Sequence, residues 1–192
     1  MKFNNVMVDL ETLGTVADAV ILSIGAVCFD LDSDRIDDDG FYASISVDSN
    51  VEAKRRIQED TLIWWMKQPP EAQAVFHEEK QTLGSALDDF ADWLGPDADK
   101  LYLWSDGADF DLPMLQHAYV QRGMGVPWKF WNNRCFRTFK SLPHARQVVI
   151  KREGVHHNAL ADALHQAKHA QLIQRVVSGR EAFKQNSMVK AA

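Results

Sequence analysis

The chain has 192 residues, of which 46% are hydrophobic and 25% charged, and this composition is that of a globular protein with one substantial core. Its formal net charge of −6 argues against a protein that coats nucleic acid without specificity. With neither a secretory signal nor a stretch long and apolar enough to span a bilayer, and with Cys28 and Cys135 as its two cysteines, the chain is expected to be a cytoplasmic protein without disulfides.

The first predicted element is a buried strand at residues 6–11, Val-Met-Val-Asp-Leu-Glu. Because successive side chains of a strand point to opposite faces, Asp9 and Glu11 are expected on the same face. Burying two carboxylates in an apolar strand costs on the order of several kcal/mol unless a positive charge compensates. Two further strands are predicted at 20–29 and 40–47, and the acidic turns between them favour antiparallel hairpins.

Helices and one more strand follow along the chain. The apolar pattern predicts helices at 59–67, 71–76 and 82–94, a core strand at 101–105 and a helix from 112. The alanine-rich run from Ala159 to Ala170 predicts a last helix. Strands followed by alternating strands and helices predict an α/β fold in which helices flank a mixed sheet. We expect one domain over 1–184 and a disordered tail over 185–192.

The relation of His157 to Asp162 can be tested by helix geometry. In one continuous helix, five residues at about 100° each would leave the two side chains roughly 140° apart. Asn158 is a good N-cap, which places His157 on the loop before the helix and Asp162 on its first turns, so both can face one site. The candidate catalytic residues are therefore four carboxylates and one histidine: Asp9, Glu11, Asp111, Asp162 and His157. Four carboxylates can hold two divalent metals beside a phosphodiester, and hard oxygen ligands favour Mg²⁺ or Mn²⁺ over zinc.

These motifs resemble those of the DEDDh 3′–5′ exonuclease superfamily: Asp-x-Glu after a hydrophobic strand, Phe-Asp at a helix start, and His-x4-Asp near the end of the domain. Four stretches are similar to the single-domain phage and prophage exonucleases that are sometimes labelled exonuclease VIII: residues 7–14, 61–68, 104–111 and 157–162. The resemblance covers roughly residues 3–175 and implies a ribonuclease H-like fold. Related chains carry Asn where Asp106 stands and Asp where Cys135 stands.

The resemblance also implies an activity, the release of nucleoside 5′-monophosphates from the 3′ end of single-stranded DNA or RNA, or of a 3′ overhang. Two Mg²⁺ or Mn²⁺ ions would be held by the four carboxylates, and His157 would accept the proton of the attacking water. Thr12 would contact the 3′ hydroxyl and Leu13 would stack on the terminal base, with Phe110 and Arg137 as further substrate contacts. Several relatives are dimers, so a homodimer is an expected assembly.

Some alternatives stay open at this point. The same carboxylates would suit a nucleic-acid-binding module with impaired catalysis, or a phosphoesterase that acts on small nucleotides. The basic residues within 129–152 form either a solvated surface loop or a basic rim around the acidic site. The pairs Trp64-Trp65 and Phe130-Trp131 favour a core role over base stacking, with one ring of each pair facing inward.

Overall fold

The computed structural model describes residues 3–179, so the tail expected at 185–192 lies outside the described residues. One five-stranded sheet has the order β3-β2-β1-β4-β5. Its strands are β1 (Asn5–Thr12), β2 (Ile21–Phe29), β3 (Phe41–Ser44), β4 (Tyr102–Ser105) and β5 (Asn133–Cys135). The pairs β1–β2 and β2–β3 are antiparallel, whereas β1–β4 and β4–β5 are parallel. The predicted mixed sheet with antiparallel hairpins is confirmed.

The helices of the described chain agree with most of the predicted segments. They are α1 (Val47–Glu52), α2 (Glu59–Trp65), α3 (Pro70–Gln73), α4 (Leu83–Leu94), α5 (Asp111–Gln121), α6 (Phe136–Ser141) and α7 (Ala159–Val177). The predicted third strand is too long, because Ser46 accepts a hydrogen bond from the Ser49 amide and starts α1 there. The sequence also missed β5 and α6, which are short elements at the edge of the sheet. Among the described residues, no helix has the length and apolar character needed to cross a membrane.

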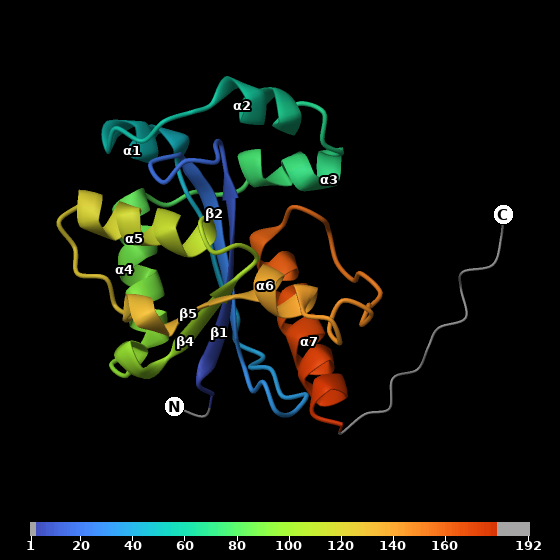
Figure 1. The fold of residues 1–192 in the computed structure, drawn as a ribbon. Coiled ribbons are helices and arrows are strands. Elements are labelled where there is room, and N and C mark those ends of the chain that lie inside the picture. Colours follow the sequence, from blue (N-terminus) through green and yellow to red (C-terminus); the bar gives the residue numbers. More distant parts are fainter. Residues whose placement is uncertain (1–2, 180–192) are drawn as a thin grey trace, which may run out of the picture.

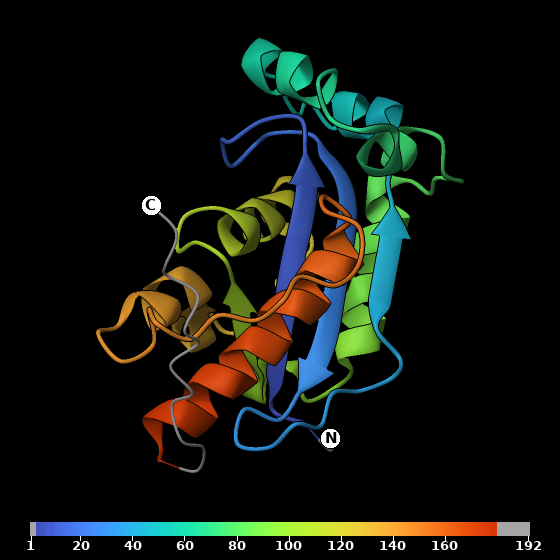
Figure 2. The same ribbon diagram turned by 90° about the vertical axis from the view of Figure 1, so that its right-hand side faces the viewer.

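Helices cover both faces of the sheet, α4 and α5 on one and α6 and α7 on the other (Figures 1 and 2). Strand β1 divides its side chains between them: Val6 and Val8 pack in the core that contains α4 and α5, while Met7 packs with Ala163 and Ala167 of α7. Since side chains alternate along a strand, Asp9 and Glu11 share the face of Met7. Their carboxylates therefore point toward α7.

The beginning of α7 lies directly on the sheet. A Cβ atom added at Gly25 would lie only 2.1 Å from the carbonyl carbon of Ala159, so no larger residue fits there without displacing the helix. Gly25 pairs with Asp9 across the β1–β2 ladder. The close contact therefore fixes the first turn of α7, and Asp162 with it, beside the end of β1 that carries the two carboxylates.

A third core lies under α2 and α3, at the end of the sheet where β1 stops (Figure 1). Trp65 is 2% exposed in this core, and its indole N–H donates to the Thr12 carbonyl at 2.8 Å. Trp64 is 41% exposed, which confirms the prediction that one ring of this pair faces inward. For Phe130 and Trp131 the same prediction is wrong, because both rings are exposed and Trp128, just before them, fills the core position instead.

Candidate active site

Three carboxylates from two elements meet at the end of β1. Asp9 and Glu11 extend from the strand and Asp162 from the first turns of α7, and one oxygen from each lies within 4.8 Å of the others. Glu11 is only 7% exposed. The prediction that Asp9 and Glu11 lie on one face of the strand is confirmed, and Asp162 lies beside them.

Asp111 approaches the same place from the opposite side of the sheet. It is the first residue of α5 and is 2% exposed, and one of its carboxylate oxygens accepts a hydrogen bond from the Leu10 amide at 3.1 Å. That bond ties the start of α5 to β1 between Asp9 and Glu11. Asp111 lies outside the group of three but lines the same cavity.

The cavity has a volume of about 570 Å³, within the usual range for small-molecule and cofactor sites. Its acidic floor is formed by Asp9, Glu11, Asp111 and Asp162. The remaining lining residues come from β1, α2, α5, α6, α7 and the loops between them, and include Thr12, Trp64, Phe110, Arg137, His157 and Gln166. All five predicted catalytic residues are thus brought to one cavity.

Burial and mutual repulsion act together on the carboxylates. The pKa of Asp9 is raised well above its ordinary value by burial and by the charges of Asp111, Glu11 and Asp162. Burial and the neighbouring Asp162 and Asp111 raise the pKa of Glu11 to about 8, and burial raises that of Asp111 to about 7. The cationic groups of the protein therefore do not balance this cluster. An oxygen-lined site of this charge fits a hard divalent cation.

These shifts predict that the protein without metal is destabilised as the pH rises. A carboxylate whose pKa is raised on folding stabilises the protein when the pH is below its pKa in the unfolded state, which is near 4.5 for Glu11. This stability is lost as the pH rises through its pKa in the folded state, which is about 8. We expect the unfolding free energy in EDTA to fall between pH 5 and 8 by roughly 1 kcal/mol per pH unit and group. Thermal unfolding at several pH values measures this.

In that experiment Glu11→Gln should flatten the pH dependence, since the amide cannot ionise. The exposed Glu79 serves as the control, and Glu79→Gln should leave the dependence as in the wild type. Added Mn²⁺ should restore stability at high pH. A protein in EDTA that grows more stable from pH 5 to 8 would contradict the prediction.

His157 lies on the loop before α7, as predicted, because Asn158 caps the helix by accepting a hydrogen bond from the Ala161 amide at 3.0 Å. The imidazole packs edge-to-face against Trp64, with ring centroids 4.8 Å apart, and also contacts Trp65 at 6.1 Å. Its backbone has a φ of 62°, a left-handed conformation that is uncommon for a residue other than glycine. Partial burial lowers the pKa of His157 below its ordinary value, which favours the neutral ring that can accept a proton.

The predicted substrate contacts are only partly brought to the cavity. Thr12, Phe110 and Arg137 line it, and the Arg137 guanidinium donates to the Asp106 carbonyl at 2.6 Å. Leu13 is 2% exposed and lies in the core under α2, so the predicted stacking on a base is not available to it. Leu13 directly follows the last residue of β1, and its side chain packs with Val20 and Trp65 instead of lining the cavity.

Two contacts at the site were not predicted from the sequence. Gln166 donates to an Asp9 carboxylate oxygen at 2.7 Å, and Arg152 forms an ion pair with Asp162 at 2.5 Å. A signal existed for Gln166, because it follows Asp162 by four residues and so lies on the same face of the helix. Arg152, between α6 and α7, belongs to the basic residues within 129–152, but no local pattern predicts its contact with Asp162.

The basic segment 129–152 is not a plain surface loop, because β5 and α6 lie within it. Its basic side chains make different contacts: Arg134 lies over the Tyr102 ring, and Lys140 forms an ion pair with Asp106 at 2.7 Å. Arg137 lines the carboxylate cavity and Arg152 pairs with one of its carboxylates. Of the two alternatives left open for this segment, these two arginines favour positive charge beside the acidic site.

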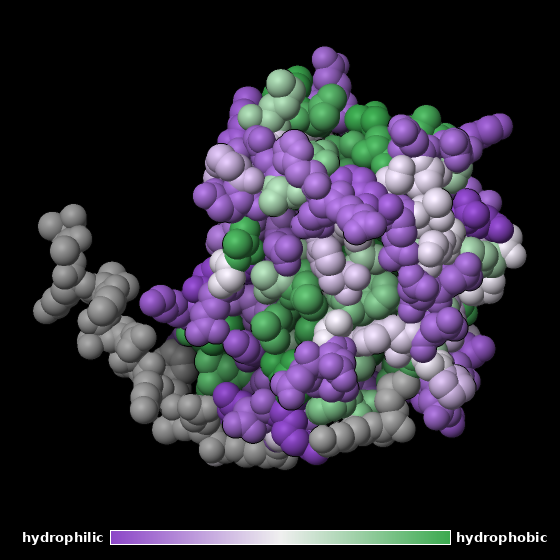
Figure 3. All heavy atoms as spheres, turned by 180° about the vertical axis from the view of Figure 1, so that it is seen from behind, coloured by the Kyte–Doolittle hydropathy of each residue, from purple (hydrophilic) through white to green (hydrophobic). Residues whose placement is uncertain are grey.

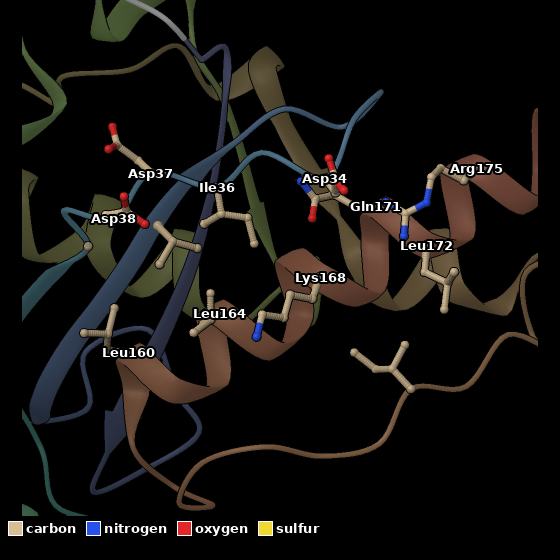
Figure 4. A pocket seen from close by; sticks show the side chains of 13 residues that line it. Asp34, Ile36, Asp37, Asp38, Leu160, Leu164, Lys168, Gln171, Leu172 and Arg175 are labelled. Carbon is tan, nitrogen blue, oxygen red and sulfur yellow. The ribbon is translucent and has the colours of Figure 1, made fainter. Parts of the chain in front are cut away.

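A second cavity, of about 690 Å³, lies between α7 and the connection from β2 to β3 (Figure 4). Its floor includes Ile36, Leu160 and Leu164, and hydrophobic side chains gather in a hollow on the face shown in Figure 3. Asp34 and Lys168 are among its polar side chains. It shares no lining residue with the carboxylate cavity, and within residues 3–179 no comparable group of ligands lies there. The chemistry of the described chain is therefore assigned to the carboxylate cavity.

Comparison with known proteins gives a family and a fold. Residues 4–174 match the Rv2179c-like 3′-5′ exoribonuclease domain. No curated protein matches the chain significantly. Cell-death related nuclease 4 (CRN-4) is similar in structure, with a TM-score of 0.59 and 16% identity over 92% of this chain and 64% of that one.

Two further solved structures are similar. S. pombe Pop2p in its Mg²⁺- and Mn²⁺-bound form has a TM-score of 0.65 and 12% identity over 94% of this chain and 86% of that one. E. coli Exonuclease I in complex with a 5cy-dT13 oligonucleotide also has a TM-score of 0.65 and 12% identity, over 91% of this chain and 41% of that one. The chain thus spans less than two thirds of CRN-4 and of Exonuclease I. Identities this low show the fold alone, and that fold is the expected ribonuclease H-like mixed sheet flanked by helices.

Proposed function

Because the chain belongs to the Rv2179c-like 3′-5′ exoribonuclease domain family, we propose that it removes nucleoside 5′-monophosphates one at a time from a free 3′ end of single-stranded nucleic acid or of a 3′ overhang. The family description makes RNA the first substrate to test, and DNA the second. One observation carries the proposal: one oxygen from each of Asp9, Glu11 and Asp162 lies within 4.8 Å of the others, in a cavity that His157 also lines.

The proposed cofactors are two Mg²⁺ or Mn²⁺ ions, held by Asp9, Glu11, Asp111 and Asp162. The fit is supported by the donor set, since these buried carboxylates repel one another and offer only hard oxygen ligands. The Pop2p structure, which has the same fold, is described as bound to Mg²⁺ and Mn²⁺. When bound, such ions would lower the pKa of the attacking water and stabilise the charge that develops on the leaving 3′ oxygen.

The other side chains of the cavity have distinct proposed tasks. His157 accepts the proton of the attacking water, for which its lowered pKa keeps the ring neutral. Gln166 orients Asp9 through its hydrogen bond, and the Leu10 amide orients Asp111. Thr12, Phe110 and the exposed Arg137 line the space that a terminal nucleotide would fill.

Two finer expectations belong to this proposal. The first is a likeness to the single-domain phage and prophage exonucleases, which rests on residues 7–14, 61–68, 104–111 and 157–162. The second is a homodimer. A nucleic-acid-binding module with impaired catalysis is the less favoured alternative, because four carboxylates and a histidine line one cavity.

We predict that cleavage requires an accessible 3′ hydroxyl. A cavity of about 570 Å³ has room for a terminal nucleotide but not for a duplex end, so a base pair must open first, at a cost of a few kcal/mol. With Mn²⁺, a 5′-labelled single-stranded RNA should therefore shorten in a ladder. The same RNA with a 3′ phosphate should resist, and a blunt duplex should be cut slowly.

Two controls separate the alternatives. Rapid cleavage of a covalently closed circle would replace the proposed exonuclease by an endonuclease. Release of inorganic phosphate from free nucleotides, with no shortening of the oligomer, would favour the small-molecule phosphoesterase. DNA of the same sequence in parallel reactions measures the sugar preference, which depends on a contact to the 2′ hydroxyl.

A further inference from the structure

Arg152 reaches into the acidic site from the segment between α6 and α7. Its guanidinium forms an ion pair with Asp162 at 2.5 Å, and the two side chains are only 20% and 15% exposed. A second guanidinium nitrogen donates to the Val155 carbonyl at 3.0 Å. The Nε atom is buried without a hydrogen-bond partner among the described residues. Arg152 is thus a largely shielded cation directed at one carboxylate, not a solvated surface charge.

This ion pair is distinctive among the described charges. Of the salt bridges between described residues, it is the one that engages a member of the carboxylate group of Asp9, Glu11 and Asp162. Burial raises the pKa of Glu11 to about 8, and the positive charge of Arg152 opposes that rise. The guanidinium therefore partly compensates the negative charge of the cavity.

A divalent cation needs the same carboxylate. Asp162 belongs to the group of three in which one oxygen from each residue lies within 4.8 Å of the others, and Arg152 contacts one of its two carboxylate oxygens. An oxygen that accepts a short, charge-assisted hydrogen bond has less electron density to offer a cation. The positive guanidinium would also repel a cation bound to the same carboxylate.

We infer that Arg152 competes with the divalent cation for Asp162 and thereby weakens the affinity of the site for metal. This inference rests on the proposed metal site. The segment that carries Arg152 has no helix or strand between Ser141 and Ala159, so the arginine can withdraw without breaking a regular element. Once withdrawn, its planar fork of donors suits the phosphate of a bound strand.

The test is Mn²⁺ binding to the full chain, measured by isothermal titration calorimetry without nucleic acid. Arg152→Gln should bind Mn²⁺ about five-fold more tightly than the wild type, the factor expected when an ion pair of ordinary strength no longer has to be broken. Lys151→Gln is the matched control, because Lys151 is an exposed neighbour and its loss changes the net charge equally. That variant should stay within about two-fold of the wild type.

The background variant Asp162→Asn separates competition from a general charge effect. When Arg152→Gln is combined with Asp162→Asn, it should not tighten Mn²⁺ binding relative to Asp162→Asn alone. Equal tightening in the Asp162→Asn background and in the wild-type background would overturn the inference. Unchanged or weaker binding by Arg152→Gln, with measurable binding by the wild type, would also overturn it but leave the proposed function intact. A wild type that binds no Mn²⁺ would instead defeat the proposed metal site itself. Should circular dichroism show that Arg152→Gln is unfolded, Arg152→Lys replaces it; a smaller tightening is then expected, and none would overturn the inference.

Discussion

Asp9→Asn is expected to abolish nucleotide release while leaving the protein folded. The amide keeps the shape of the side chain, and its oxygen can still accept the hydrogen bond that Gln166 now donates to Asp9 at 2.7 Å. What is lost is the negative charge that would hold the divalent cations. Since metal catalysis contributes several kcal/mol, turnover should fall by about 10³-fold or more. The shortening of a 5′-labelled single-stranded RNA with Mn²⁺ measures this.

The same substitution should stabilise the protein in EDTA. The raised pKa of Asp9 reflects burial and repulsion by Asp111, Glu11 and Asp162, and a neutral amide removes both costs. Asp60→Asn is the matched control, because Asp60 lines the cavity but is exposed and lies outside the carboxylate group. Retention of more than about a tenth of the activity by Asp9→Asn would contradict the assignment of Asp9 as a metal ligand.

His157→Ala should lower kcat by about 10²- to 10⁴-fold with little change in KM, because a general base acts in the chemical step. His156→Ala is the control: its ring is exposed and lies 5.9 Å from that of His157. Steady-state kinetics on the same RNA separate kcat from KM. An equal loss in His156→Ala would mean that the pair of histidines has a structural role.

The pH profile gives a second readout for His157. Partial burial lowers its pKa, so the neutral ring predominates at a lower pH than for an ordinary histidine. In the wild type, kcat should therefore increase with pH below about pH 6.5 and stay constant above it. His157→Ala should lose this rising limb. Its persistence in the variant would assign the limb to another group.

Several features of the site are decided by residues close together in the sequence. The alternation of β1 places Asp9 and Glu11 on one face, and Asn158 ends the loop that carries His157 by capping α7. Such features depend on backbone geometry over a few residues, so a local pattern is enough to predict them. The three motifs also pointed to the superfamily before any contact was known.

Short elements could not be predicted in this way. Strand β5 has only three residues and α6 only six, and both are stabilised by the β4 edge and by the packing of Phe136 against α7. Helices this short are marginal on their own, so tertiary contacts decide whether they form. The sequence of this region showed its basic charges but not the elements that carry them.

The tertiary structure alone decided which contacts between distant residues hold the carboxylates in place. Leu10 and Asp111, joined by a hydrogen bond, are 101 residues apart, and Gln166 and Asp9 are 157 apart. Leu13 is buried because it packs with Val20 and Trp65 in the core under α2 and α3. The sequence by itself determined which residues could bind metal and which faces of β1 and α7 carry them, because these follow from side-chain chemistry and local periodicity. The spacing of the carboxylates, and the arginine that pairs with one of them, depend on how α5, α7 and the loop before α7 pack against the sheet.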